Sequence, residues 1–180
     1  MDPVLEQLHA EIASAVGDLN IAQTQLRSRN STKPDRWTIQ QILEHLFLTY
    51  SSTEDAISAR LAKGTPTRTR PTLPQHCMQF FVTKFGYMPS GREAPLPVIP
   101  PAATPAESCL NGAALAAKAR EHLNRLDCIL DTAEQRFGSV AAVTHFVLGP
   151  LTPSQWRCFH RTHGRHHLRQ IAAIRRDHNL

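Results

Sequence analysis

Apolar residues recur every three or four positions along four long stretches of this sequence, and this spacing restricts the chain to a helical fold. The stretches are residues 3–28, 38–61, 105–137 and 153 to near the end. No stretch alternates apolar and polar residues over a useful length, so no strand is predicted. Four long helices in a chain of 180 residues predict an all-α fold, a four-helix bundle, in one domain spanning residues 1–180.

Residues that favour helix starts lie at the expected beginnings of these stretches. Asp2–Pro3 and Thr152–Pro153 each combine a capping side chain with a proline that suits the first turn. Thr38 lies three residues before Gln41, which is the spacing of a capping box. Asp35 is a second candidate for the cap of that helix.

Nine of the thirteen prolines lie between residues 65 and 106, and this density excludes a long helix there. Residues 73–85 predict a short helix that docks on the core, because aromatic and apolar side chains recur along them. Residues 89–105 predict an extended crossover between the second and third long helices. A flexible interdomain linker is the alternative, which we disfavour because neither flank resembles a complete domain.

Composition narrows the class of protein. The chain is 41% hydrophobic and 19% charged, as in ordinary globular proteins, and no apolar run is long enough to cross a bilayer. The first residues are acidic, unlike a secretory signal, so the expected location is the cytoplasm. Four widely spaced cysteines predict neither a disulfide framework nor a zinc ribbon. The net charge of +5 leaves nucleic acid open as a partner.

Ten histidines are the unusual feature of the composition, and several of them share one face of the last helix. At 100° per residue, His163 and His167 lie within the apolar stripe, and His160 also lies inside it. The arginines, Arg157 among them, fall on the opposite face, which is expected to be solvated. Two inward imidazoles at positions i and i+4 can converge on one ion, and His45 is the best third ligand. From spacing alone, a metal site and a buried, hydrogen-bonded histidine cluster are equally supported.

Two motifs resemble a known family. They are W-T-x-x-Q-x-L-E-H-L, at residues 37–46, and H-F-V-L-G-P-L-T-P-S-Q-W-R-x-F-H-R-T-H-G-R-H-H-L-R-Q-I, at residues 145–171. Together they resemble the DinB/YfiT-like superfamily of metal-dependent hydrolases. The resemblance implies an up-up-down-down four-helix bundle whose divalent metal is held by His45, His163 and His167. If the register is shifted by one turn, His160 takes the place of His163.

The same resemblance implies a small-molecule substrate and two chemistries, namely hydrolysis and a thiol-dependent transfer or isomerisation. In the second chemistry, a low-molecular-weight thiol binds the metal. Neither motif carries a carboxylate placed as a general base, which favours thiol chemistry and leaves the catalytic residues unassigned. Three imidazoles suit Zn, Ni, Fe or Cu. The resemblance also implies a homodimer.

Other motif residues carry weaker expectations. Trp37 and Trp156 are expected in the core, Glu44 at the surface or beside the metal ligands, and Cys158 on the arginine side. Gln170 either holds a water or substrate or packs in the core, and His145 is a candidate for the mouth of the site.

Two other functions remain open. One is a non-catalytic metal-binding or stress-related bundle, and the other is nucleic-acid binding through the arginine face between residues 157 and 176. The second lacks interleaved aromatic residues and any recognised motif.

Overall fold

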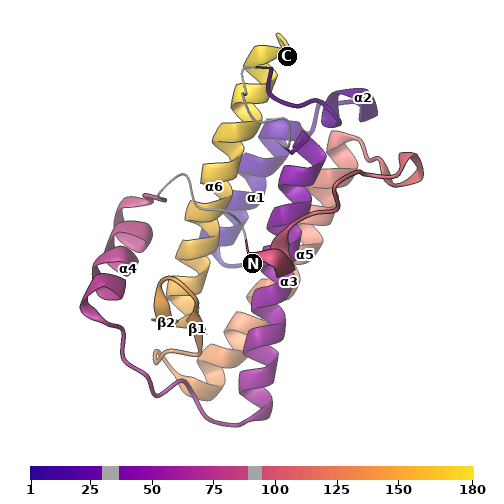
Figure 1. Ribbon diagram of the computed structural model, residues 1–180. Helices are drawn as coiled ribbons and strands as arrows, with labels where there is room; N and C mark the ends of the chain where they lie inside the picture. Colours follow the sequence, from indigo (N-terminus) through magenta and orange to yellow (C-terminus); the bar gives the residue numbers. More distant parts are fainter. Residues whose placement is uncertain (30–36, 89–94) are drawn as a thin grey trace.

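The structure is a computed structural model that describes residues 1–29, 37–88 and 95–180. It is mostly helical, in agreement with the predicted all-α class (Figure 1). The α-helices are α1 (Pro3–Val16), α2 (Ile21–Thr24), α3 (Ile39–Ala62), α4 (Leu73–Phe85), α5 (Gly112–Phe137) and α6 (Pro153–Asp177). Two 3₁₀ turns (Leu96–Val98 and Ala106–Ser108) and two strands, β1 (Val143–His145) and β2 (Gly149–Leu151), complete the described elements.

The four long helices α1, α3, α5 and α6 lie side by side and enclose the core (Figure 1). Helices α1 and α3 each pack against both α5 and α6. Helices α1 and α6 run in one direction and α3 and α5 in the other (Figure 1), so the up-up-down-down order implied by the resemblance is wrong and the order along the chain is up-down-down-up. Helix α4 packs against α6 on the outside of this group, with the β-strands beside it (Figure 1). Within residues 1–29, 37–88 and 95–180, none of the helices combines the length and apolar character needed to span a membrane.

The predicted helix starts at Asp2, Thr38 and Thr152 are confirmed. Thr38 and Gln41 form the capping box: the Thr38 backbone N–H donates to Gln41 Oε1 at 2.9 Å, and the Gln41 backbone N–H donates to Thr38 Oγ1 at 3.1 Å. The Asp2 side chain accepts from the Val4 backbone N–H. The alternative cap, Asp35, lies outside the described residues.

Two helix boundaries differ from the prediction. The first long helix ends at Val16 instead of residue 28, and Asn20 begins the separate short helix α2 with a capping box of its own. The third long helix begins at Gly112 instead of residue 105, because the Asn111 side chain caps it at the Ala114 N–H. A Cβ at Gly112 would overlap the Val16 carbonyl, so glycine is required where these two chain segments cross.

The prediction of no strands is wrong, because β1 and β2 form a small antiparallel hairpin. His145 pairs with Gly149 at its closed end. Helix α4 fixes this hairpin through Gln79, whose side-chain amide donates to the carbonyls of Leu148 at 2.7 Å and Pro150 at 2.9 Å.

The proline-rich crossover is described from residue 95 onward, whereas residues 89–94 of the predicted extended segment lie outside the described residues. Its described part includes the 3₁₀ turn Leu96–Val98 and is held along α3 by two glutamines. The Gln41 amide donates to the Pro101 carbonyl at 2.7 Å, and the Gln40 amide donates to the Ser108 carbonyl at 2.9 Å.

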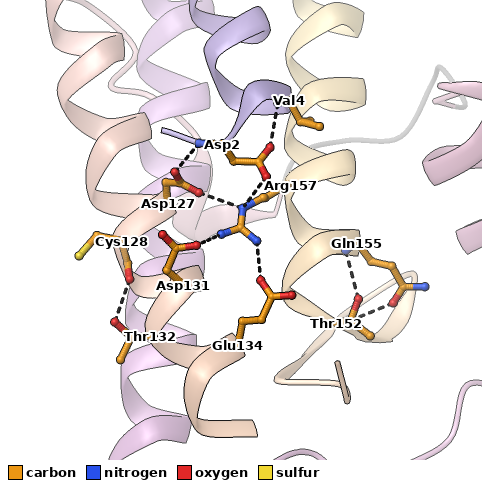
Figure 2. Close-up of polar contacts among 10 residues, drawn as sticks. All are labelled: Asp2, Val4, Asp127, Cys128, Asp131, Thr132, Glu134, Thr152, Gln155 and Arg157. Atoms are coloured by element: carbon orange, nitrogen blue, oxygen red, sulfur yellow. Dashed lines mark hydrogen bonds and ion pairs between the residues drawn. The ribbon is translucent and has the colours of Figure 1, made fainter. Parts of the chain in front are cut away.

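Arg157 is buried, which contradicts its predicted place on a solvated face (Figure 2). Its guanidinium donates to Asp127 at 2.9 Å, to Glu134 at 3.1 Å and to Asp131, all on α5. Asp2, at the start of α1, lies 3.7 Å from the same group. Arg157 does lie on the side of α6 away from the histidines, but α5 and the start of α1 cover that side. Its ion pairs therefore connect α6 to α5 and α1.

Other arginines of α6 pair with acidic residues in α1 and just after it. Arg165 binds Glu11, and Arg175 binds Asp18 at 2.7 Å. Much of the expected basic face is therefore a set of ion pairs between helices.

Candidate metal centre

Three histidine side chains from two helices converge at one point. His45 lies on α3, and His163 and His167 lie one turn apart on α6. The Nε2 atom of His163 is 3.3 Å from that of His45 and 3.0 Å from that of His167. The structure thus brings together the three residues proposed as ligands, and one potential ligand atom from each lies within 4.8 Å of the others. His160 is not part of this group.

Two of the three imidazoles are oriented by hydrogen bonds on the side away from the centre. His45 Nδ1 lies 2.7 Å from the Val98 carbonyl oxygen, which can only accept, so this nitrogen carries the hydrogen. His167 Nδ1 lies 3.0 Å from Gln170 Oε1 and donates to it in the same way. Each ring then presents an unprotonated Nε2 to the centre, as a metal ligand must.

Burial keeps the imidazoles neutral. Desolvation is the largest cause of the lowered pKa of His45, and it places the pKa of His163 well below its ordinary value. Burial likewise lowers the pKa of His167 to about 3, and the neighbouring His45 contributes in the same direction. Because His163 has at most one ring hydrogen when neutral, it can donate to only one of the two lone pairs that face it. A cation at the centre would satisfy all three nitrogens at once.

The spacing of these nitrogens suits a transition-metal ion. With metal–nitrogen bonds of 2.0–2.1 Å and tetrahedral angles, two ligand nitrogens stand about 3.3 Å apart. The separations of 3.0 and 3.3 Å around His163 agree with that value. The group contains no carboxylate, so a bound divalent ion would keep its full charge.

Comparison with known families gives one match. Residues 7–173 match the model of a family described as "Protein of unknown function (DUF1569)". The chain belongs to the DUF1569 family. The matched region contains all three histidines and both helices that carry them. No curated protein and no solved structure matches the chain.

Trp37 packs against the centre of this DUF1569 protein instead of lying fully in the core. Its ring centroid lies 4.8 Å from that of His45 and 6.3 Å from that of His167, and the side chain is partly buried. Trp156, in contrast, is buried in the core as predicted. Gln170 was predicted either to hold a water or substrate or to pack in the core. Instead, its Oε1 accepts from His167 Nδ1, and its Nε2 lies 3.3 Å from His166 Nε2.

Three other candidates are not members of the histidine group. His145 accepts from the backbone N–H groups of Val147 and Leu148 at 3.1 Å, so it stabilises the hairpin. Glu44 accepts from the Gln40 side chain at 2.8 Å. Cys158 is partly buried and is not a member of the group.

Sequence reasoning missed the Val98 carbonyl, which orients His45. A backbone group leaves no signal in side-chain patterns. Gln41, on the same helix as His45, carried a usable signal. In a capping box only the side-chain oxygen of the glutamine is used, so its NH₂ group is free to donate to another part of the chain, here the Pro101 carbonyl.

Proposed function

We propose that this protein is a metal-dependent enzyme whose divalent transition metal is bound by His45, His163 and His167. The convergence of three Nε2 atoms, with the outer nitrogens of His45 and His167 hydrogen-bonded, carries this proposal. The resemblance of both histidine motifs to the DinB/YfiT-like superfamily supports it. So do the four adjacent long helices, in which α1 and α6 run antiparallel to α3 and α5.

Three protein ligands leave coordination positions open, which is typical of catalytic rather than structural metal sites. When bound, the ion would act as a Lewis acid that polarises a substrate or acidifies a water or thiol. His45 and His167 are held by their hydrogen bonds, and Trp37 covers one side of them. The reaction class we propose is hydrolysis, or a thiol-dependent transfer or isomerisation, of a small molecule.

The cysteines agree with a thiol-rich environment. All four are free thiols, as expected in a reducing compartment. We therefore propose a cytoplasmic protein, where low-molecular-weight thiols are available as co-substrates.

Elemental analysis of protein purified without a histidine tag tests the ligand set. The wild-type protein is expected to contain about one transition-metal ion per chain, the occupancy of a single three-imidazole site. His45→Ala, His163→Ala and His167→Ala should each lose most of it, whereas His76→Ala, at an exposed position on α4, should not. Full occupancy in His167→Ala would refute the assignment.

Cobalt substitution distinguishes a catalytic site from a merely metal-binding one. An open coordination position should accept a small thiol and produce a sulfur-to-cobalt charge-transfer band, which His167→Ala should lack.

A second candidate, a non-catalytic metal-binding bundle, is favoured by the lack of any carboxylate in the histidine group. A cobalt spectrum unaffected by every thiol and substrate-like ligand would select that candidate.

A further inference from the structure

Four buried polar atoms lie close to the metal centre without a hydrogen-bond partner among the described residues. They are the Tyr50 hydroxyl, Trp156 Nε1 and both ring nitrogens of His160. Tyr50 and His160 are completely buried, and Trp156 is 4% exposed. Buried polar groups in native proteins are nearly always hydrogen-bonded, to protein or to ordered water, so these atoms require an explanation.

His160 adjoins both of the other side chains, Tyr50 from α3 and Trp156 from its own helix α6. The ring centroid of His160 lies 5.2 Å from that of Tyr50 and 5.7 Å from that of Trp156. The indole N–H only donates, whereas the hydroxyl and the neutral imidazole each donate and accept. A mixed set of uncharged donors and acceptors suits water, which needs two to four polar partners to be held inside a protein.

His163 has the same deficit on the side away from the metal centre. Its Nδ1 is buried and has no partner, whereas the corresponding nitrogens of His45 and His167 are hydrogen-bonded. Histidines that bind metals almost always donate their second ring N–H to an acceptor. His160 lies three residues before His163 on α6, a spacing that makes the two side chains neighbours on one helix face.

We infer that Tyr50, Trp156 and His160 form a binding site for ordered water, and that this water links His160 to Nδ1 of His163. His160 is then a positioning residue that orients the third imidazole through water, and not a metal ligand. The link to His163 rests on the proposed function, whereas the water site itself does not.

Removal of one hydroxyl tests the water site without any metal. Tyr50→Phe keeps the ring and deletes the oxygen. If the hydroxyl is bonded to water, the melting temperature of the chelator-treated protein should fall by roughly 2–4 °C. The other tyrosine, Tyr87, is exposed, so Tyr87→Phe is a matched control that should leave the melting temperature unchanged. A rise in the melting temperature of Tyr50→Phe would show a dry, unpaired hydroxyl and overturn the inference.

Metal affinity tests the link to His163. His160→Leu should weaken metal binding about 10- to 100-fold in a chelator competition, as is usual when an outer hydrogen-bond partner of a ligand is lost. His160→Gln, which can still bind water, should fold even if the leucine variant does not, and it should retain more of the affinity. His122→Leu, on α5 and stacked on Phe47, is the control for loss of a histidine outside the site. Wild-type affinity in a folded His160→Leu protein would refute the link.

Nitrogen-15 spectra of the imidazoles give a readout that packing alone would not change. The metal-loaded protein should show His163 protonated at Nδ1, with a hydrogen that exchanges more rapidly with solvent in His160→Leu. If the wild-type protein binds no metal, the proposed function fails, but the result for Tyr50→Phe still decides whether the water site exists.

Discussion

Mild acid should strongly destabilise the metal-free protein, because several of its histidines are buried without charge. Burial lowers the pKa of His145 to about 4 and the pKa values of His160 and His167 to about 3. In the unfolded chain the same side chains return to a pKa near 6.5. Between these values the unfolded chain binds protons that the folded protein does not. The stabilisation by these neutral histidines is therefore complete above pH 6.5. It is lost as the pH falls towards their pKa values in the folded protein.

The size of the effect follows from proton linkage. At pH 5, each of these three histidines should lower the free energy of unfolding by roughly 2 kcal/mol relative to pH 8. Together they remove about 6 kcal/mol, which is comparable with the whole stability of a typical domain, 5–15 kcal/mol. The protein should thus be close to unfolding at pH 5.

Urea denaturation followed by far-ultraviolet circular dichroism, in the presence of a chelator at pH 8, 7, 6 and 5, measures this loss. His145→Gln should reduce the difference between pH 8 and pH 5 by roughly 2 kcal/mol, since it removes one of these groups. His76→Gln, at an exposed position, should leave the difference unchanged. Equal free energies of unfolding at pH 5 and pH 8 in the wild-type protein would refute the reasoning.

Three further outcomes are expected. Arg157→Met should destabilise the protein by about 3–5 kcal/mol in urea denaturation, because it leaves the buried Asp127 without its cation. Arg125→Met, which removes an exposed ion pair with Glu121 and a longer one, 3.6 Å, with the partly buried Glu54, should cost clearly less. Gln170→Ala should weaken metal binding about 10- to 100-fold in chelator competition, because His167 loses the acceptor that orients it, and an unchanged affinity would contradict this. Light scattering should give twice the chain mass of 20.1 kDa if the protein is a homodimer, and the chain mass itself would exclude one.

The long helices were predictable because their apolar spacing extends over many turns, whereas their ends depend on single residues. The chain turns at Gly17 and starts again at Asn20, although apolar residues continue at helical spacing to residue 28. The hairpin of three-residue strands is too short to show any alternation. Side-chain donors from Gln79 hold it, and a contact so distant in sequence leaves no local pattern.

The three proposed ligands were predictable because His163 and His167 are separated by one helical turn on the apolar side of α6. The residue types alone favoured no particular partner for their second ring nitrogens. One of these partners is the backbone carbonyl of Val98, in a segment that reaches His45 only after the chain has crossed over α3. The choice between His163 and His160 depends equally on how α3 and α6 pack, since both histidines face inward.

A helical wheel of α6 separates an apolar face from a charged one, but α6 has neighbours on more than one side. It packs against α1, α3, α4 and α5. Its histidines therefore meet α3, while its arginines meet the carboxylates of α5 and α1. An arginine held by a carboxylate must lose that partner before it can bind a phosphate, so these ion pairs oppose nucleic-acid binding by this face. The histidine face has the opposite character, because three imidazole nitrogens converge there with lone pairs that suit a cation. We accordingly expect the chemical activity of α6 on its inward face, which carries His163 and His167.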